Sequence, residues 1–319
     1  MLTTLRADSP TRRSEPPPAA RELRSMNCLS IDVEEYFHAE AFAQALPRSR
    51  WPRMESRAGR GLEQILTMLE RHDQRATFFV LGQCVRPLGS LLRAARDAGS
   101  EIACHGFGHQ HLSRMTPQQL RDDVSRAIDE ISDVLGVTPL GYRAPTFSVT
   151  RATGWALDVL LEAGFEYDAS VFPIHHDRYG VPDAPGVVFR ALTPNGNEIL
   201  EFPPLTMRCG PLRFPVGGGG YLRLLPGAVP RRALAQRQRR GQAAMLYVHP
   251  WELDPEQPRI PIGPLAQWRH RVNLHTTARK LERLLCGFRF ETALDIVRHL
   301  RTRRNPPPYS FRADLRGTD

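Results

Sequence analysis

Short apolar runs alternate with amphipathic segments along most of this 319-residue chain. The runs 27–33, 76–81 and 101–104 have the length and apolar content of buried strands. Between them, segments 62–71 and 88–98 carry apolar residues at helical spacing. Because neighbouring parallel strands need a crossover connection, which is usually a helix, this alternation predicts an α/β fold with a parallel sheet.

The alternation continues with clear helix signals. Thr116 is a typical N-cap, with Pro117 at the first helical position and Gln119 three residues after the cap, and Gly136 provides a stop. The sequence 193–196 (TPNG) between two apolar runs predicts a β-hairpin. The remaining expected elements are, in order, strand 140–143, helix 152–163, strand 167–171, hairpin strands 187–191 and 198–202, helix 230–239, strand 244–248, helix 273–285, strand 288–292 and helix 293–300.

The ends of the chain differ in composition from its centre. Residues 1–25 are rich in proline and arginine and lack the apolar core of a secretory signal, so we expect a disordered leader. Prolines after Asn305 predict a disordered tail over 301–319. Residues 26–300 should form one folded domain with the hairpin inserted. A cytoplasmic location follows by default, with peripheral membrane association as a further option, and no apolar run approaches the roughly 20 residues of a transmembrane helix.

The charge and the cysteines exclude two classes of protein. The net charge is +9, but 42 of the 43 basic residues are arginine, a skew typical of a composition bias, so we do not expect nucleic-acid binding. Weak attraction to an acidic polymer or an anionic membrane surface fits the charge better. The five cysteines form no CxxC pair, which indicates a reducing compartment and no disulfide framework.

Two histidines, His105 and His109, follow the expected strand 101–104 and are separated by Gly-Phe-Gly. Imidazoles four residues apart can converge on one metal ion, and the glycines indicate a tight bend. Cys104 could supply a thiolate, but alternation along the strand should point it to the opposite face. The pair alone is weak, since an accidental origin is about equally plausible.

Carboxylates at the end of the first strand could complete such a site. Asp32 and Glu34 face the same way in an alternating strand, and Glu35 follows them. A carboxylate is a natural third zinc ligand, and a second one nearby can act as general base. Asp32 interrupts an otherwise apolar strand, so its charge needs a reason beyond a solvated turn.

Other polar residues also follow expected strands. Arg143 closes the strand 140–143, Asp168 and Ser170 lie at the end of the next, and His249 closes the strand 244–248. The carboxyl ends of strands form one face of a β/α barrel, where active sites lie. Their common placement is stronger support for a site than any single motif.

In this order, the motifs resemble those of the NodB-type polysaccharide deacetylases, carbohydrate esterase family 4. They are Asp32-x-Glu34, His105-Gly-Phe-Gly-His109, Arg143-Ala-Pro145, Asp168-x-Ser170 and Val248-His249-Pro250. The segments 247–258 and 271–274 resemble the subgroup linked to bacterial exopolysaccharide export systems with exosortases. The resemblance covers residues 26–290. It implies a distorted (β/α)7 barrel, a divalent metal that is usually zinc, and hydrolysis of N-acetyl groups on hexosamine units.

Carried over residue by residue, the resemblance implies roles for the site. Asp32 would be the catalytic base, oriented by Arg143, and His249 the general acid, tuned by Asp168. His105 and His109 would be metal ligands. The backbone N–H of Thr146 would help to hold the oxyanion. Trp251, Tyr221 and Phe147 could stack on sugar rings, although core or loop packing is the more ordinary interpretation.

The sequence departs from the family pattern at one of the expected metal ligands. The family's first motif usually has two adjacent aspartates, the second of which binds the metal, and that position here is Val33. Some relatives use Asp-x-Asp, which Glu34 matches, so we expect Glu34 as third ligand. Glu35 and a lost metal site are the alternatives.

Three functions stay open at this point. The first is a metal-dependent hydrolase acting on an N-acetylated polysaccharide or a lipid-linked oligosaccharide. The second is a metal-independent amidohydrolase of allantoinase-like type acting on a small ureide. The third is a polysaccharide-binding relative without turnover, against which the presence of Asp32, Arg143 and His249 argues.

Overall fold

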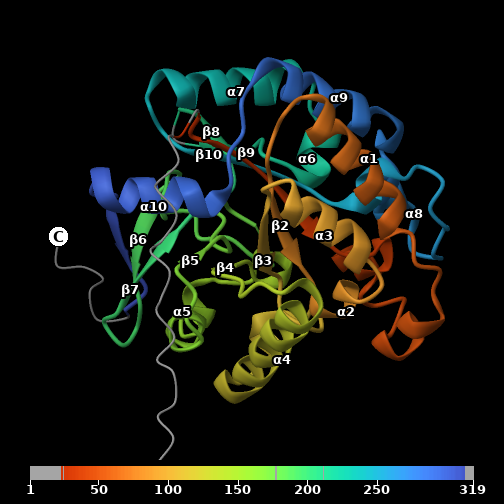
Figure 1. Ribbon diagram of the computed structural model, residues 1–319, viewed down its shortest axis with the longest axis horizontal. Coiled ribbons are helices and arrows are strands. Elements are labelled where there is room, and N and C mark those ends of the chain that lie inside the picture. Colours follow the sequence, from red (N-terminus) through yellow and green to blue (C-terminus); the bar gives the residue numbers. More distant parts are fainter. Residues whose placement is uncertain (1–22, 24, 177, 211, 313–319) are drawn as a thin grey trace, which may run out of the picture.

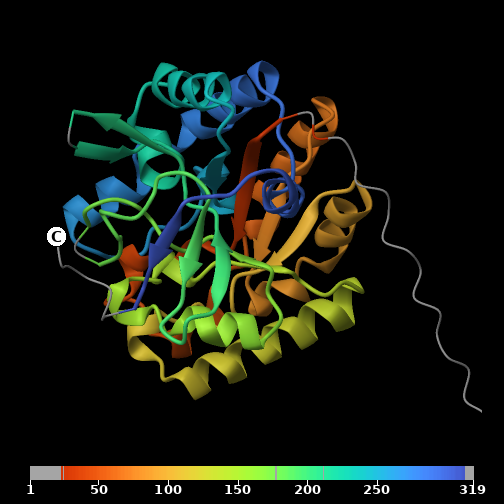
Figure 2. The same ribbon diagram turned by 90° about the vertical axis from the view of Figure 1, so that its left-hand side faces the viewer.

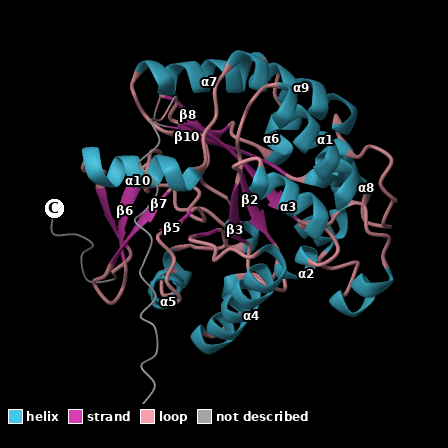
Figure 3. Ribbon diagram, viewed as in Figure 1, coloured by secondary structure: helices cyan, strands magenta, loops and turns pink. Residues whose placement is uncertain are grey.

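A computed structural model describes residues 23, 25–176, 178–210 and 212–312. Its main sheet has nine strands in the order β10-β1-β2-β3-β4-β5-β7-β6-β11 (Figures 1 and 3), and β8 and β9 form a separate two-stranded sheet. The strands are β1 (Asn27–Val33), β2 (Thr77–Val80), β3 (Glu101–Cys104), β4 (Gly141–Tyr142), β5 (Tyr167–Asp168), β6 (Phe189–Leu192), β7 (Glu198–Glu201), β8 (Thr206–Cys209), β9 (Leu212–Pro215), β10 (Ala244–Val248) and β11 (Pro308–Ser310).

The strands from β10 to β7 are all parallel, which makes seven, and β6 joins them antiparallel to β7 as the expected hairpin. The described strands do not close into a hydrogen-bonded ring, since β10 and β11 are edges. The chain that follows β7 contacts the edge strand β10 at two isolated bridges. Pro204 pairs with Met245, and Gly218 pairs with Tyr247. The sheet is therefore barrel-like and open, consistent with the α/β fold expected for the family.

Helices occupy the crossovers between the strands, and Figure 1 shows α1, α3, α4 and α5 around the outside of the sheet. Thr116 caps α4 in a capping box with Gln119, and Gly136 ends it with a left-handed φ of 67°, as the sequence predicts. The helices are α1 (Ala58–Arg71), α2 (Gly82–Val85), α3 (Gly89–Asp97), α4 (Pro117–Leu135), α5 (Ala156–Glu162), α6 (Gly219–Leu224), α7 (Ala228–Arg239), α8 (Pro264–Arg271), α9 (Leu274–Gly287) and α10 (Ala293–Arg303).

Alternation along β1 divides the core in two. Leu29, Ile31 and Val33 belong to the large cluster packed under the surrounding helices, whereas Cys28 belongs to an inner cluster with residues of other strands. α10 contributes apolar residues to that inner cluster and so covers one end of it. Asp32 has the parity of Cys28, which places it inside the barrel beyond the apolar layer.

Some expectations for the elements were wrong. Residues 288–292 form no strand, because only Glu291 pairs, in an isolated bridge to Cys28. Part of the tail is folded: α10 extends to Arg303, and β11 pairs in parallel with β6. The sequence also did not predict the hairpin of β8 and β9 or helix α8. The leader, apart from residues 23 and 25, and the segment 313–319 lie outside the described residues. No helix in the described part of the chain is long and apolar enough to cross a bilayer.

Candidate active site

A cavity of about 190 Å³ opens at the carboxyl ends of the strands. Its lining brings together residues from both halves of the chain. They are Asp32, Glu34, Ala39, Glu40, His105, His109, Ala144, Thr146, Phe147, Tyr179, Gly219, Gly220, Tyr247, His249 and Trp251. Six of the predicted site residues are therefore among its polar lining: Asp32, Glu34, His105, His109, Thr146 and His249.

Asp32 is buried and paired with Arg143 as expected. One carboxylate oxygen lies 2.5 Å from the Arg143 guanidinium, and the other faces His249 at 3.8 Å. Arg143 is fully buried, donates to Ser30 and the Ala169 carbonyl, and lies over the ring of Phe79. The guanidinium fixes one oxygen of the Asp32 carboxylate and leaves the other to face the pocket.

Glu34 meets the two predicted histidines in one buried group, and the ligand atoms of all three lie within 4.8 Å of one another. The Glu34 carboxylate is 2.6 Å from Nε2 of His109 and 3.9 Å from Nε2 of His105. Burial alone would raise the pKa of Glu34, but the neighbouring histidines, His109 foremost, hold it well below its usual range. An ionised carboxylate and two imidazole nitrogens form a ligand set that suits zinc.

The imidazole of His105 is prepared to act as a ligand. Burial lowers the pKa of His105 to about 4, so its neutral form dominates at neutral pH. Its Nδ1 lies 2.7 Å from the Arg143 carbonyl, which can only accept, so Nδ1 carries the proton and Nε2 keeps its lone pair toward Glu34. The donor atoms thus fit a divalent metal bound by Glu34, His105 and His109.

Glu35, the alternative ligand, is used elsewhere. Its carboxylate accepts from the Ser56 hydroxyl and from the backbone N–H groups of Arg57 and Ala58, at the start of α1. Negative charge at a helix N-terminus satisfies N–H groups that have no partner within the helix. Glu35 therefore anchors α1, and Glu34 faces the histidines.

The loop from His105 to His109 is shaped by contacts that are distant in sequence. Asp123 of α4 accepts from the N–H groups of Phe107 and Gly108, and Gly106 has a φ of 75°. His109 itself has a positive φ of 52°, which is costly for a non-glycine residue. The tight bend that the glycines predicted is thus confirmed, and a carboxylate from α4 helps to maintain it.

Several residues of the cavity have strained backbone conformations. Of the five non-glycine residues with positive φ in the described chain, His109, Thr146 and Phe147 line the cavity. Such conformations persist where the surroundings impose them, and they cluster at functional sites. The N–H of Thr146 has no hydrogen-bond partner among the described residues, so it is available to an oxyanion, the role that the resemblance implies.

The carboxylate that contacts His249 is Glu252 and not Asp168, so the predicted tuning by Asp168 was wrong. Glu252 lies 3.0 Å from Nδ1 of His249, while Nε2 faces the oxygens of Asp32 and Glu34, each at 3.8 Å. Burial would lower the pKa of His249, but the contact with Glu252 and the other carboxylates outweigh it and raise this pKa to about 9. The imidazolium form is the one that can donate a proton.

Asp168 instead pairs with another carboxyl group beneath Arg143. It is adjacent to Glu201 in the β5–β7 register and accepts from the Ser170 hydroxyl, which in turn accepts from the N–H of Ala144. Glu201 accepts from the N–H of Val171. Both side chains are fully buried. Asp168 and Ser170 thus support the loop that carries Thr146.

Trp251 is packed as the more ordinary interpretation of the sequence suggests, although it also lines the cavity. It is 6% exposed, stacks against His249 and against His270, and its indole N–H donates to Glu34. Tyr221 is not among the residues that line the cavity. Phe147, which was also a candidate from the sequence, lines the cavity together with Tyr179 and Tyr247. The sequence places Trp251 near the site but does not reveal which ring covers it.

Three residues that shape the site were not predicted from the sequence: Glu252, Asp123 and His38. His38 stacks beside His109 with ring centroids 5.6 Å apart, and burial lowers the pKa of His38 to about 3. Glu252 lies in the HPWE motif, three residues after His249, and that spacing was the one signal that could have revealed it. Asp123 and His38 carry no comparable local signal.

The structure thus combines a barrel-like α/β fold with a candidate metal centre, a fixed aspartate and a facing histidine. Residues 58–167 match the sequence profile of the polysaccharide deacetylase family. Residues 169–298 match a domain of unknown function, DUF3473. The histidines of the metal group lie in the first matched segment, whereas His249 and Glu252 lie in the second.

Known proteins resemble parts of the chain. A peptidoglycan deacetylase from Helicobacter pylori is 30% identical over 117 residues, or 37% of this chain and 38% of the relative. The peptidoglycan deacetylase-like protein FGM2 of Gibberella zeae is 32% identical over 117 residues, or 36% of this chain and 34% of the relative. The matches thus span little more than a third of these relatives. The crystal structure of a candidate polysaccharide deacetylase from Mycobacterium smegmatis superposes with a TM-score of 0.58 at 20% identity, over 92% of this chain and 96% of that one, which supports the fold.

Proposed function

We propose that the protein is a metal-dependent hydrolase that removes N-acetyl groups from hexosamine units of a bacterial exopolysaccharide. One observation carries the proposal: Asp32, His249 and the group of Glu34, His105 and His109 converge in a single cavity. The relatives named as peptidoglycan deacetylases support an N-acetylated glycan as substrate. The resemblance of segments 247–258 and 271–274 to the exopolysaccharide-linked subgroup supports the particular polymer.

Hydrolysis of the amide begins with a water molecule near Asp32. The free oxygen of Asp32 accepts the proton of the water as its oxygen forms a bond to the acetyl carbon. Arg143 holds Asp32 in place. A divalent metal bound by Glu34, His105 and His109 supplies Lewis-acid polarisation at this centre.

Two further groups act on the tetrahedral species, one as it forms and one as it breaks down. The Thr146 N–H donates to the developing oxyanion, an interaction of the type worth about 3–4 kcal/mol per well-placed donor. His249 protonates the amine nitrogen as the carbon–nitrogen bond breaks. The products are acetate and a free amino sugar, and the raised pKa of His249 favours the protonated ring that this step needs.

Acetate release tests the proposal. The purified protein would be incubated with N-acetylglucosamine oligomers and with native exopolysaccharide, with and without a chelator, and its metal content measured by elemental analysis. We expect about one metal per chain and chelator-sensitive release. His109→Ala should lose both metal and turnover because it removes one of three ligands.

The matched control is His111→Ala. His111 lies two residues further along, outside the cavity, and bonds Ser113 through Nδ1. This variant should keep metal and activity. Full activity of His109→Ala would refute the proposal, and turnover of a small ureide by metal-free protein would favour the amidohydrolase alternative.

A further inference from the structure

We propose that Arg223 and Glu252 form a positioning pair that fixes the ring of His249, so that helices α6, α8 and α9 set the orientation of the general acid. This inference rests on the proposed function for its catalytic meaning. All of its parts lie in residues 169–298, the segment that matches a domain of unknown function.

Glu252 contacts His249 at two points. One of its oxygens lies 3.0 Å from Nδ1 of the ring and also accepts from the backbone N–H of His249 at 3.0 Å. Because this oxygen binds Nδ1, the opposite nitrogen, Nε2, is the one that faces the cavity. The contact therefore fixes both the position and the direction of the ring.

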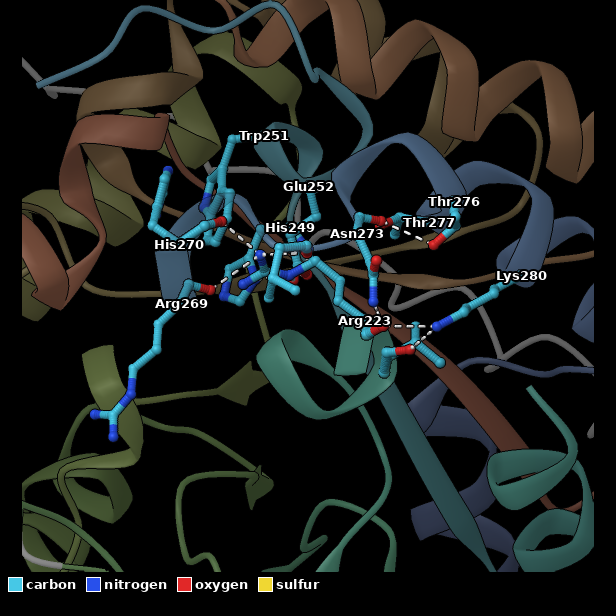
Figure 4. Close-up of polar contacts among 12 residues, drawn as sticks. Arg223, His249, Trp251, Glu252, Arg269, His270, Asn273, Thr276, Thr277 and Lys280 are labelled. Carbon is cyan, nitrogen blue, oxygen red and sulfur yellow. Dashed lines mark hydrogen bonds and ion pairs between the residues drawn. The ribbon is translucent and has the colours of Figure 1, made fainter. Parts of the chain in front are cut away.

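The second oxygen of Glu252 is held by Arg223 of α6. Nε of Arg223 lies 2.8 Å from it, and both side chains are at most 4% exposed. A buried ion pair without further partners would be costly, but Arg223 has them. Its Nη1 donates to the carbonyls of Arg269, His270 and Val272 at the end of α8 (Figure 4).

Helix α9 in turn holds the backbone of α6. Lys280, the single lysine of the chain, donates to the carbonyls of Leu222, Arg223 and Leu225, and Asn273 donates to the Arg223 carbonyl. Figure 4 shows Asn273 and Lys280 meeting this point from one side. The arginine is thus fixed at its backbone by α9 and at its guanidinium by the end of α8.

The face of the ring is fixed as well. Trp251 stacks on His249 with ring centroids 5.0 Å apart, and His270 of α8 also stacks on Trp251, at 4.7 Å. Gln257 bonds Nε2 of His270 at 2.8 Å. Stacking on Trp251 limits tilting of the His249 ring, and the contact with Glu252 limits its rotation. A proton on Nε2 of His249 therefore keeps one direction toward the cavity.

The same turn offers a matched control. Asp254, two residues after Glu252, forms an equally buried pair with Arg57, at 2.6 and 2.9 Å. Neutralising either carboxylate removes one buried ion pair from the turn that follows His249. Only Glu252 touches the ring. Glu252→Gln and Asp254→Asn therefore separate positioning of His249 from general support of the turn.

We expect Glu252→Gln to lower kcat for acetate release by about 100-fold, within the usual contribution of a placed proton donor, with KM and metal content little changed. Asp254→Asn should lose a similar amount of thermal stability yet keep kcat within about threefold. In a His249→Ala background, Glu252→Gln should cost less than about twofold, because residues that act as a unit are not additive. Arg223→Lys should retain more activity than Arg223→Met.

A second readout does not need turnover. In protein labelled with ¹⁵N-histidine, the resonance missing from His249→Gln identifies the ring. Its Nδ1–H should exchange slowly with solvent in the wild type and in Asp254→Asn, and quickly in Glu252→Ala and Arg223→Met. If the wild type releases no acetate, the proposed function fails, and this measurement still decides on the pair.

Two results would overturn the inference. One is equal loss of kcat in Glu252→Gln and Asp254→Asn, which would make Glu252 a structural residue. The other is unchanged proton exchange at His249 in Glu252→Ala.

Discussion

Several buried charges of this protein are arranged in pairs. Arg143 pairs with Asp32 of the cavity, Arg223 with Glu252 beside His249, and Arg57 with Asp254 of the following turn. The pair of Asp168 and Glu201 differs, because two carboxyl groups lie side by side with no room for two negative charges. Burial raises the pKa of Asp168, and burial together with the charge of Asp168 raises that of Glu201.

This pair predicts a pH-dependent stability. Carboxyls with a raised pKa keep a proton in the folded state that the unfolded chain releases, so their contribution is complete below the ordinary pKa of about 4 and declines as the pH rises. Glu201→Gln imitates the protonated form at every pH. The variant should gain stability relative to the wild type toward alkaline pH, by at most about 1.4 kcal/mol per pH unit for one proton. Urea unfolding between pH 5 and about pH 9 measures the difference.

Glu198→Gln serves as its control. Glu198 lies on the same strand but is exposed, and it pairs with Arg190 at the surface. Its stability should follow that of the wild type at each pH. A constant offset between Glu201→Gln and the wild type would contradict a shared proton.

The contacts of Glu34 and His249 show which parts of the site could be predicted from the sequence. Glu34 could be predicted because the alternation of β1 puts it on the face of Asp32. The partner of His249 was harder to predict, since Asp168 and Glu252 both lie at strand ends on the same rim and only the spacing of Glu252 from His249 favours it. Only the short helical turn Pro250–Leu253 brings the carboxylate of Glu252 back to the ring.

The glycine run 217–220, which leads into α6, allows the chain to lie in close contact with β10. A Cβ on Gly218 would lie 1.9 Å from the Tyr247 carbonyl oxygen, at the point where the two residues pair in an isolated bridge. This contact places the end of β10, and with it His249, beside the chain that enters α6. Four consecutive glycines, 217–220, predict a flexible or close-approach segment, and close approach is what the structure contains.

Gly218→Ala should therefore destabilise the fold by about 3 kcal/mol or more, because an extra methyl group in a tight contact forces the backbone apart. Chemical denaturation gives the value. Gly227→Ala is the matched control, since a Cβ there meets nothing within 4 Å and the residue lies at the start of the next helix. It should change stability by less than about 1 kcal/mol. Similar losses in both variants would show that the contact with Tyr247 is unimportant.

Most elements could be predicted because their patterns are local. Strands β1, β3 and β10 have the predicted bounds, and α4 begins and ends at its predicted signals. Residues 288–292 resemble a strand in composition, but only Glu291 finds a partner. The pairing of β11 with β6 joins segments more than a hundred residues apart, which no local pattern reveals.

At the scale of the whole molecule, charge is distributed unevenly. Residues 202–251 contain eight arginines and no aspartate, glutamate or lysine, against a net charge of +9 for the chain. Arg231, Arg232, Arg239 and Arg240 are exposed on and just after α7, at the top of Figure 1, and form no ion pair with a described carboxylate. Such a cluster attracts anionic surfaces through long-range electrostatics.

We therefore predict binding to anionic lipid vesicles at low ionic strength, measured by co-sedimentation. It should weaken as added salt shortens the Debye length toward about 8 Å. Replacing Arg231, Arg232, Arg239 and Arg240 with glutamine should abolish it. The control replaces Arg86, Arg121, Arg298 and Arg301, which pair with glutamates, and removes the same net charge. Equal loss in both variants would assign binding to net charge alone.

The position of β1 has a consequence for how the protein is made. β1 lies between β2 and β10, so the strand that carries Asp32 and Glu34 acquires one neighbour early and the other more than two hundred residues later. During synthesis the metal-ligand residues emerge from the ribosome long before His249 and the helices that orient it. On the proposed function, a growing chain would therefore be catalytically silent until His249 and the helices that orient it have been made.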